Sequence, residues 1–429
     1  MRRDFLKLCG LAGLGFAAPA FLPGRVRGAE AMADPYEGPY YAVFNASGGW
    51  DTTYLMDPKG VNEINRLYKE GDILTLGAHR YAPNAKTMLA GSGMSNEDFY
   101  KEYASDLLVF NGLDYAVNNH SPGARYMATG KLDSLSYPTF AALVAACKGP
   151  ACPISYLTFG NYSATGNLVA MSRVPYLPSL QRIANADAVE GNARSPYHDE
   201  FALTRIEQTL AAHDRTLALD PRLPRHEHAQ SMLYAAQVNS KALQRVTAHI
   251  PKESPKERLA QQVEIALASF KAGVCVSANL SIGQFDSHQN NDPDQMKLLP
   301  EFLAGIHHLI RRAEELGIRD KLVVVIQSEM GRTPTYNKGN GKDHWSIGSV
   351  MFIGPKIKGD RMIGATDDKQ FAVPIDPNTL AQKPEGGLKV KPEHIHQALR
   401  EYAGIAEHPF AKQFPLVFPE GEKLRGFWG

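Results

Sequence analysis

A continuous apolar run, Leu322–Ile326, constrains the fold of this chain more than any other stretch. Such a β-branched run is typical of a strand covered on both faces, as the strands of a parallel sheet are. An acidic residue, Glu329, follows the run, and a Gly-rich loop then leads through His344 to a second apolar strand, Val350–Ile353. Ligands of open α/β sheets bind beyond the carboxyl ends of the strands, so Glu329 and His344 are predicted to lie at a functional site.

The same arrangement occurs once more, upstream of this stretch. Val274–Ile282 is strand-like, and Asp286 and His288 follow it. Between the two strands, apolar residues recur at helical spacing over Leu299–Ala313, which predicts an amphipathic helix. A strand–helix–strand unit of this kind forms a right-handed crossover. We therefore expect Asp286 and Glu329 to leave neighbouring or near-neighbouring strands at one edge of the sheet.

Strand-like and helix-like segments alternate through the first part of the chain, which is typical of an α/β fold with a parallel sheet. One strand, Tyr40–Phe44, leads through a glycine pair to Asp51, which could bind a cation or cap a helix. Another, Asp106–Phe110, precedes Ser121, which could cap a helix or act as a nucleophile or ligand at its positive end. The charged, helix-prone stretch from about 178 to 255 is predicted to be a helical insertion beside the sheet.

The N-terminus has the features of an export signal. Arg2 and Arg3 form a twin-arginine pattern, a short Gly- and Ala-rich apolar stretch follows, and Ala29–Ala31 fits a cleavage site. The apolar stretch is too short and too rich in glycine for a permanent membrane span. An amphipathic N-terminal helix is the alternative to a signal peptide. We expect a Tat signal over residues 1–31, export in folded form to the periplasm or beyond the cell, and one α/β domain over residues 32–429.

The charge balance limits the classes of partner that this chain can bind, and its cysteines indicate where a disulfide could form. With 46 basic against 45 acidic residues, the chain has no basic field for nucleic acid and no acidic tail. Cys147 and Cys152 flank a short loop and could form a disulfide in an oxidising compartment, or stay reduced. Cys275 lies in an apolar strand and is expected to be buried.

Carboxylates and imidazoles at several predicted strand ends, without a cysteine ligand, indicate a divalent metal site. Zinc or manganese suits such a set best, and calcium or magnesium also fits a mixed site. A metal ion there would polarise a phosphoryl or sulfuryl oxygen. Arg332, close after Glu329, could contact an anionic substrate oxygen or form a structural salt bridge.

The motifs SGGWDT near the start, FDSHQNN in the middle, and SEMGRTP followed by GKDHW resemble those of a known family. They are similar to secreted proteins of the domain-of-unknown-function family 1501, which is related to alkaline phosphatases and sulfatases. The resemblance covers nearly the whole mature chain and implies an α/β/α sandwich with metal at the C-terminal edge of the sheet. It implies as metal ligands Asp51, Asp286, His288, Glu329 and His344, and it places Ser121, or its neighbour His120, near the superfamily's nucleophile.

The leading hypothesis is a periplasmic, metal-dependent hydrolase of phosphate, sulfate or related anionic esters, with Ser121 as nucleophile and Arg332 as a substrate or structural arginine. Alkaline phosphatases have an aspartate and then a histidine where this chain has Glu329 and Met330. A one-metal site is therefore expected. The same departure supports an alternative, a non-catalytic secreted protein that keeps the fold, binds a metal ion and serves as a binding or assembly partner.

Overall fold

The structure is a computed structural model that describes residues 34–83, 93–160, 162–185, 188–189, 192–218 and 242–429. The predicted Tat signal, residues 1–31, lies outside the described residues. Among the helices of these ranges, none is both long and apolar enough to span a membrane.

An eight-stranded sheet forms the centre of the molecule, in the order β14-β4-β13-β10-β1-β9-β5-β6. Its strands are β1 (Tyr40–Ala46), β4 (Leu107–Asp114), β5 (Tyr156–Thr158), β6 (Met171–Ser172), β9 (Ser277–Ile282), β10 (Leu322–Gln327), β13 (Ile347–Ile353) and β14 (Arg361–Ile363). Strand β13 runs antiparallel to β10 and β4, and the other pairs of this sheet are parallel. The predicted α/β class with a mostly parallel sheet is confirmed.

The central strand β10 is buried along its whole length, as its continuous apolar run predicts. Side chains of a strand alternate between the two faces of its sheet. Accordingly, Val324 and Ile326 belong to the core on one face, and Val323 and Val325 belong to the core on the other. A sheet with apolar side chains on both faces requires a cover on both sides.

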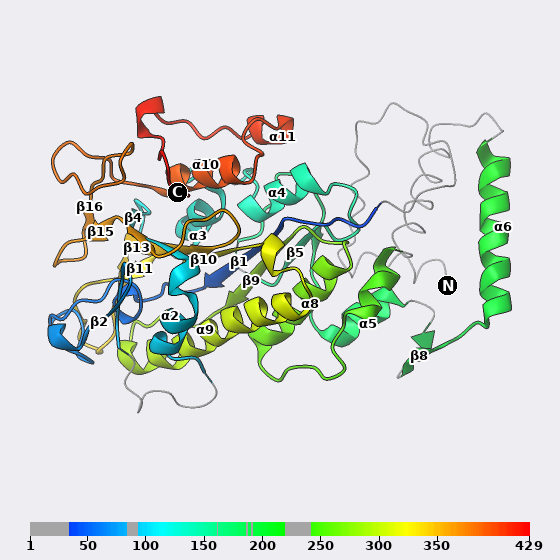
Figure 1. Ribbon diagram of the computed structural model, residues 1–429, viewed down its shortest axis with the longest axis horizontal. Coiled ribbons are helices and arrows are strands. Elements are labelled where there is room, and N and C mark those ends of the chain that lie inside the picture. The colour runs from blue at the N-terminus through cyan, green and yellow to red at the C-terminus, as the bar shows by residue number, and fades with distance from the viewer. Residues whose placement is uncertain (1–33, 84–92, 161, 186–187, 190–191, 219–241) are drawn as a thin grey trace.

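Helices provide this cover on each face of the sheet. Those that contribute to the first core are α2 (Asn96–Tyr103), α5 (Leu177–Ala184), α8 (Arg258–Lys271) and α9 (Asn291–Glu315). Those that contribute to the second are α3 (His120–Thr129), α4 (Phe140–Lys148), α10 (Pro392–Tyr402) and α11 (Pro409–Lys412). Figure 1 shows α8 and α9 on one side of the sheet and α4 and α10 on the other. The predicted α/β/α sandwich is therefore the observed architecture.

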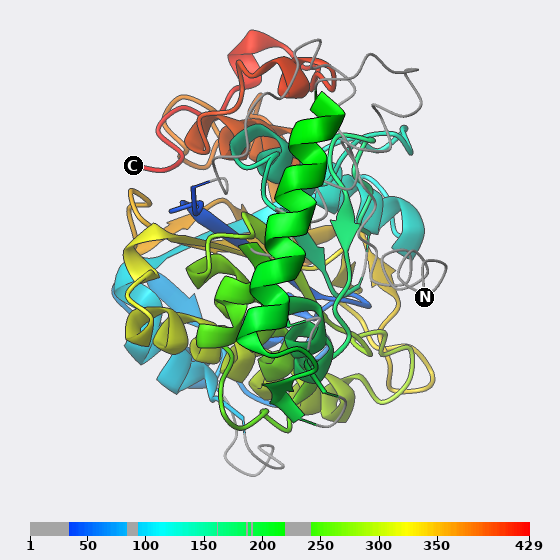
Figure 2. The same cartoon turned by 90° about the vertical axis from the view of Figure 1, so that its right-hand side faces the viewer.

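The described part of the expected insertion begins in α5 and continues into a two-stranded ribbon of β7 (Ala188–Val189) and β8 (Asn192–Pro196). A long helix, α6 (Glu200–Ala218), follows and stands apart from the sheet in Figure 1, and in Figure 2 it crosses in front of the rest of the molecule. A short 3-10 helix, η5 (Arg245–Ala248), leads back toward α8. Residues 219–241 of the insertion lie outside the described residues.

Short elements complete the chain. They are η1 (Thr52–Tyr54), η2 (Glu70–Asp72), β2 (Leu74–Leu76), β3 (His79–Tyr81), η4 (Ala104–Asp106), η6 (Arg319–Lys321), β11 (Gly331–Arg332), β12 (His344–Trp345), β15 (Ala365–Thr366), β16 (Ala372–Val373) and η7 (Glu420–Glu422). Cys147 and Cys152 are free thiols, so the disulfide considered from the sequence is not formed here, and Cys275 is buried as expected.

The loops that carry the candidate site residues lie at one edge of the sheet. The parallel strands β1, β4, β9 and β10 all end there, and the antiparallel strand β13 begins there. The segments that follow the four strands, and the ribbon β11–β12 that precedes β13, therefore meet at this edge.

The stability of the fold should depend on pH through His396 of α10. Its ring is buried, and its Nε2 donates to the backbone oxygen of Met127 at 2.8 Å. Burial lowers the pKa of His396 from 6.5 to about 4, so the unfolded chain takes up a proton that the folded protein excludes. The free energy of unfolding should therefore fall as pH decreases from 6.5 to about 4, by at most about 3 kcal/mol.

The His396→Gln variant keeps a side-chain N–H for Met127 but does not titrate. Urea unfolding in EDTA at pH 7.5 and pH 5 should show a smaller loss of stability for the variant than for the parent, because the other histidines are common to both. Equal losses in the two proteins would contradict this assignment.

Candidate metal centre

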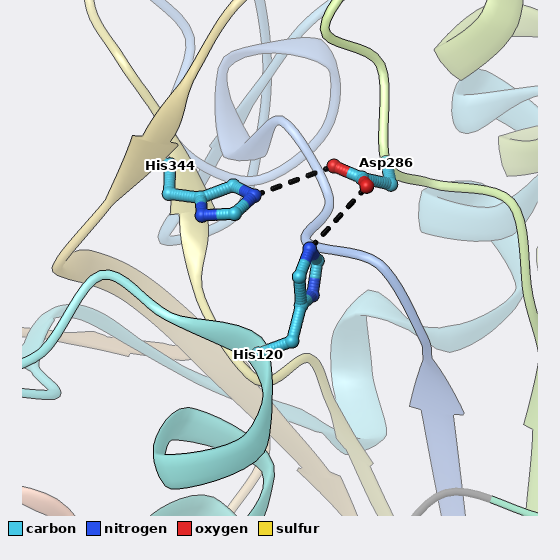
Figure 3. A group of neighbouring side chains, drawn as sticks. All are labelled: His120, Asp286 and His344. Carbon is cyan, nitrogen blue, oxygen red and sulfur yellow. Dashed lines mark ion pairs between the residues drawn. The ribbon is translucent and has the colours of Figure 1, made fainter.

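Separate segments of the chain bring imidazoles and carboxylates to this edge of the sheet. His120 begins α3 after β4, Asp286 and His288 follow β9, Glu329 follows β10, and His344 lies in β12. Figure 3 shows the side chains of His120, Asp286 and His344 pointing toward one another from three different segments.

Asp286, His288 and His344 present three atoms at the separations expected of ligands to one metal ion. Asp286 Oδ1 lies 3.1 Å from His288 Nε2 and 3.4 Å from His344 Nε2, and the two Nε2 atoms are 2.9 Å apart. With bonds of about 2.0–2.1 Å to each ligand, the ligand atoms of a tetrahedral zinc site lie about 3.3 Å apart. The three atoms therefore form a triangular face of the size that a zinc ion requires.

His120 lies beside this triangle. Its Nε2 is 3.3 Å from the other oxygen of Asp286, Oδ2, and its ring is 4.4 Å from that of His344 between centroids. One ligand atom each of His120, Asp286 and His344 fall within 4.8 Å of one another. The donor set at this edge is thus three imidazoles and one carboxylate.

The second nitrogen of each imidazole faces a hydrogen-bond acceptor. The Nδ1 contacts are His288 with Asp343 Oδ1 (2.8 Å), His344 with the backbone oxygen of Asn118 (2.9 Å) and His120 with Glu329 Oε1 (3.2 Å). Carboxylates and carbonyls only accept, so each Nδ1 carries a proton, and Nε2 of the neutral ring is left to bind a cation. Metal-binding histidines are oriented in this way in proteins.

The electrostatics of the cluster suit a cation. Burial lowers the pKa of His344, so its Nε2 is unprotonated at neutral pH. A neutral His288 would then direct its own lone pair at His344 across 2.9 Å, which is repulsive unless a proton or a metal ion lies between the two atoms. The hydrogen bond from His288 lowers the pKa of Asp343, so this acceptor is ionised. The residues present therefore fit a divalent metal ion.

Arg332 supports Asp286 from beneath. Its side chain is fully buried, and its Nη2 lies 2.7 Å from Asp286 Oδ1. Its other nitrogens donate to backbone oxygens of Gly49 (2.9 Å, from Nε) and Lys342 (3.1 Å, from Nη1). Burial raises the pKa of Asp286, but the hydrogen bond and charge of Arg332 outweigh this and lower it overall. Of the two roles considered for Arg332, these contacts are those of a structural salt bridge.

Asp51 lies in a separate, buried network. Its Oδ2 is 2.6 Å from Lys342 Nζ, and both side chains are fully buried. Asn291 Nδ2 also donates to Oδ2, at 3.0 Å. Oδ1 accepts from the backbone and hydroxyl of Thr53, so Asp51 caps η1. The structure therefore does not bring Asp51 into the histidine cluster, and its contacts are those of the helix cap that the sequence also allowed.

Glu329 and Ser121 lie next to His120. Glu329 Oε1 accepts from Gly48 N at 2.7 Å and faces His120 Nδ1, whereas Oε2 is buried and has no partner among the described residues. The hydrogen bond to Glu329 raises the pKa of His120. Ser121 occupies the first turn of α3, and its side chain is exposed. Glu329 thus orients a histidine, and Ser121 remains open to solvent.

Two residues of this cluster have no assigned role of their own from the sequence. His120 is only an alternative to Ser121 there, and Asp343 is only part of the GKDHW motif that contains His344. The signal for His120 was available, because it follows the β4 strand as Asp286 follows β9. The role of Asp343 depends on the contact with His288, which is 55 residues away in the chain.

The buried pair of Lys342 and Asp51 should matter strongly for stability. Removing one partner of a buried ion pair leaves an uncompensated charge and typically costs about 3–5 kcal/mol. Guanidinium unfolding of Lys342→Met should show a loss of this size. The double variant Lys342→Met, Asp51→Asn should be more stable than Lys342→Met alone, because no charge is left buried. A double variant less stable than the single one would contradict this account.

No curated protein matches the chain. Among solved structures, it is similar to the PsFucS1 sulfatase from Pseudoalteromonas sp., with 10% identity, a TM-score of 0.40, and coverage of 90% of this chain and 74% of that one. It is also similar to the lipoteichoic acid synthase LtaP from Listeria monocytogenes, with 8% identity, a TM-score of 0.38, and coverage of 89% and 76%.

The motifs that flank the cluster fall within a match to a family model. The model, described as "Protein of unknown function (DUF1501)", matches residues 45–384. This match spans well over half of the chain, so the resemblance seen in the motifs is confirmed and the chain belongs to the DUF1501 family.

Proposed function

We propose that this protein is an exported hydrolase that binds one zinc ion through Asp286, His288 and His344 and cleaves phosphate, sulfate or related anionic esters. The observation that carries the proposal is the triangle formed by Asp286 Oδ1 and the two Nε2 atoms, with edges of 2.9, 3.1 and 3.4 Å. The twin-arginine pattern of residues 1–31 supports export to the periplasm or beyond the cell.

The donor set favours some of the metals that the sequence left open over others. Imidazole nitrogens suit zinc and other transition metals, whereas calcium and magnesium prefer oxygen ligands. Two imidazoles on the triangle and a third, His120, beside it therefore favour zinc first and manganese second. One such cluster among the described residues fits the one-metal site that Met330 leads us to expect.

Each residue around the site has a distinct role in the proposed reaction. A bound zinc ion would supply a Lewis acid that polarises the ester. Arg332 holds Asp286, Asp343 holds His288, and Glu329 holds His120 with its Nε2 toward the cluster. Ser121 is the candidate nucleophile, because its exposed hydroxyl follows His120 in the first turn of α3.

One observation favours the second candidate function, a secreted metal-binding protein without catalysis that serves as a binding or assembly partner. Two cationic side chains beside the site, Arg332 and Lys342, are fully buried and paired with carboxylates. Neither can meet the negative charge of an ester, so that charge would fall on the metal ion and the imidazoles. The two functions differ in whether the metal-loaded protein turns over an ester.

Metal analysis tests the site itself. The purified mature protein, incubated with zinc and desalted, should retain about one zinc ion per chain. The double variant Asp286→Ala, His288→Ala should retain none, because it lacks two corners of the triangle. Ser121→Ala is the matched control and should bind zinc like the parent. A parent without metal after incubation with zinc, manganese and calcium in turn would contradict the proposal and leave these residues structural.

Ester hydrolysis tests the activity. The zinc-loaded parent should hydrolyse p-nitrophenyl phosphate or p-nitrophenyl sulfate, and the Asp286→Ala, His288→Ala variant should not. If Ser121 is the nucleophile, Ser121→Ala should lower kcat by at least about 1000-fold with zinc still bound. Unchanged turnover in Ser121→Ala would remove Ser121 from the mechanism, and a zinc-loaded parent without turnover would favour the non-catalytic function.

A further inference from the structure

Asn337, in the loop between β11 and β12, uses both ends of its side-chain amide at the edge of the cluster. Its Nδ2 donates to the backbone oxygen of His288 at 2.9 Å and to Asp343 Oδ1 at 3.2 Å. Its Oδ1 accepts from the backbone N–H groups of Gly339 (2.9 Å) and Gly341 (3.0 Å). The Asn337 side chain thus connects His288, a candidate metal ligand, with Asp343, which accepts a hydrogen bond from His288 Nδ1. It also holds the turn of its own loop.

Backbone hydrogen bonds join the loop of Asn337 to the loop of His288. Three hydrogen bonds join the two loops: Asn290 N to Gly339 O (3.2 Å), Asn291 N to Asn340 O (2.9 Å) and Lys342 N to Ser287 O (3.0 Å). Gly341 allows this close approach, because a Cβ atom there would lie 1.9 Å from the backbone oxygen of His288. The position of the Asn337 amide relative to His288 is therefore well defined.

Apart from its contact with the His344 ring, 4.6 Å away between centroids, packing holds the His288 ring only weakly. The side chains of His288 and Asp343 are 44% and 58% exposed, so the surrounding core does not select their rotamers. Their orientation depends on hydrogen bonds. Asp343 Oδ1 accepts hydrogen bonds from both His288 Nδ1 and Asn337 Nδ2. These two bonds hold the carboxylate next to the Nδ1 side of the His288 ring.

We propose that Asn337 is a positioning residue of the metal site, which sets the direction of His288 Nε2 by holding both the His288 backbone and the Asp343 carboxylate. This inference rests on the metal site proposed above. Without Asn337, Asp343 and His288 would sample solvent-facing rotamers and would have to be ordered when the metal binds. Loss of such an outer contact typically lowers metal affinity about 10–100-fold.

Zinc affinity is the readout, measured by competition with a chromophoric chelator on the mature protein. Asn337→Ala should raise the Kd for zinc at least about 10-fold, while its Tm in EDTA stays close to that of the parent. Thr335→Ala is the matched control, because Thr335 lies in the same loop and its side chain is exposed. Its Kd should equal that of the parent. An unchanged Kd in Asn337→Ala would overturn the inference.

Asn337→Asp separates the two ends of the amide and serves if Asn337→Ala lowers the Tm in EDTA. It keeps an oxygen to accept from Gly339 and Gly341, so the turn is retained, but it loses the donor to His288 and Asp343. The added negative charge would by itself attract a cation. A raised Kd in this variant therefore supports positioning through the lost donor, and an equal or lower Kd would overturn it.

A double-mutant cycle with Asp343→Asn tests the route of the effect. If Asn337 acts through Asp343, the loss of zinc affinity in Asn337→Ala, Asp343→Asn should be smaller than the product of the two separate losses. Strict additivity would overturn that route. If the parent binds no zinc, the proposed function itself is overturned. If the parent and Asn337→Ala bind zinc with the same Kd, only the role of Asn337 is overturned.

Discussion

The parallel pairing of β1 with β9 and with β10 is the constraint on which the rest of the structure depends. It brings three strand ends, and hence the loops that carry Asp286 and Glu329, to one edge of the sheet. A chain of buried amides crosses the three strands near that edge: Asn45 Nδ2 donates to Asn279 Oδ1 at 2.5 Å, and Gln327 Nε2 donates to Asn45 Oδ1 at 3.0 Å. A shift of register by one residue would separate these amides and leave buried polar groups unpaired, which is costly. The amide chain therefore helps to fix the relative height of the loops that follow.

Beneath the loops, two buried cations compensate two carboxylates. A buried charge without a partner is strongly unfavourable, so Arg332 with Asp286 and Lys342 with Asp51 are each constrained as pairs. The pairs are linked, because the backbone oxygen of Lys342 accepts from Arg332 Nη1 at 3.1 Å. This arrangement neutralises the carboxylates from the protein side, and Asp286 Oδ1 with the Nε2 atoms of His288 and His344 forms the outward, partly exposed face. The cations thus belong to the fold, and the outward face is available for a metal ion.

The sequence predicts those elements and residues whose signals are local. It does not predict the role of a side chain when that role depends on a partner far away in the chain. The apolar run of β10 and the helical spacing of α9 are local, and both elements are found as expected. The same holds for His288 and His344, each close to a strand and each in the cluster. Asp51 could not be assigned in this way, because its partner Lys342 is 291 residues away in the chain. Arg332 had two plausible roles, and only its burial distinguishes them.

The site therefore has two layers that differ in what holds them. The lower layer, with Arg332, Lys342 and the strand ends, is buried and is stabilised by paired charges and by the apolar core. The upper layer is partly open to solvent, since His288 is 44% and Asp343 58% exposed, and it is held by hydrogen bonds between loops, whereas Asp286 joins the two layers through Arg332. Substitutions in the lower layer are expected to lower the stability of the fold first, because they leave a buried charge without its partner. Substitutions of His288 or Asp343 in the upper layer are expected to change the geometry of the candidate site at little cost in stability. A site built in this way can vary its loops, and with them its ligands, on an unchanged sheet.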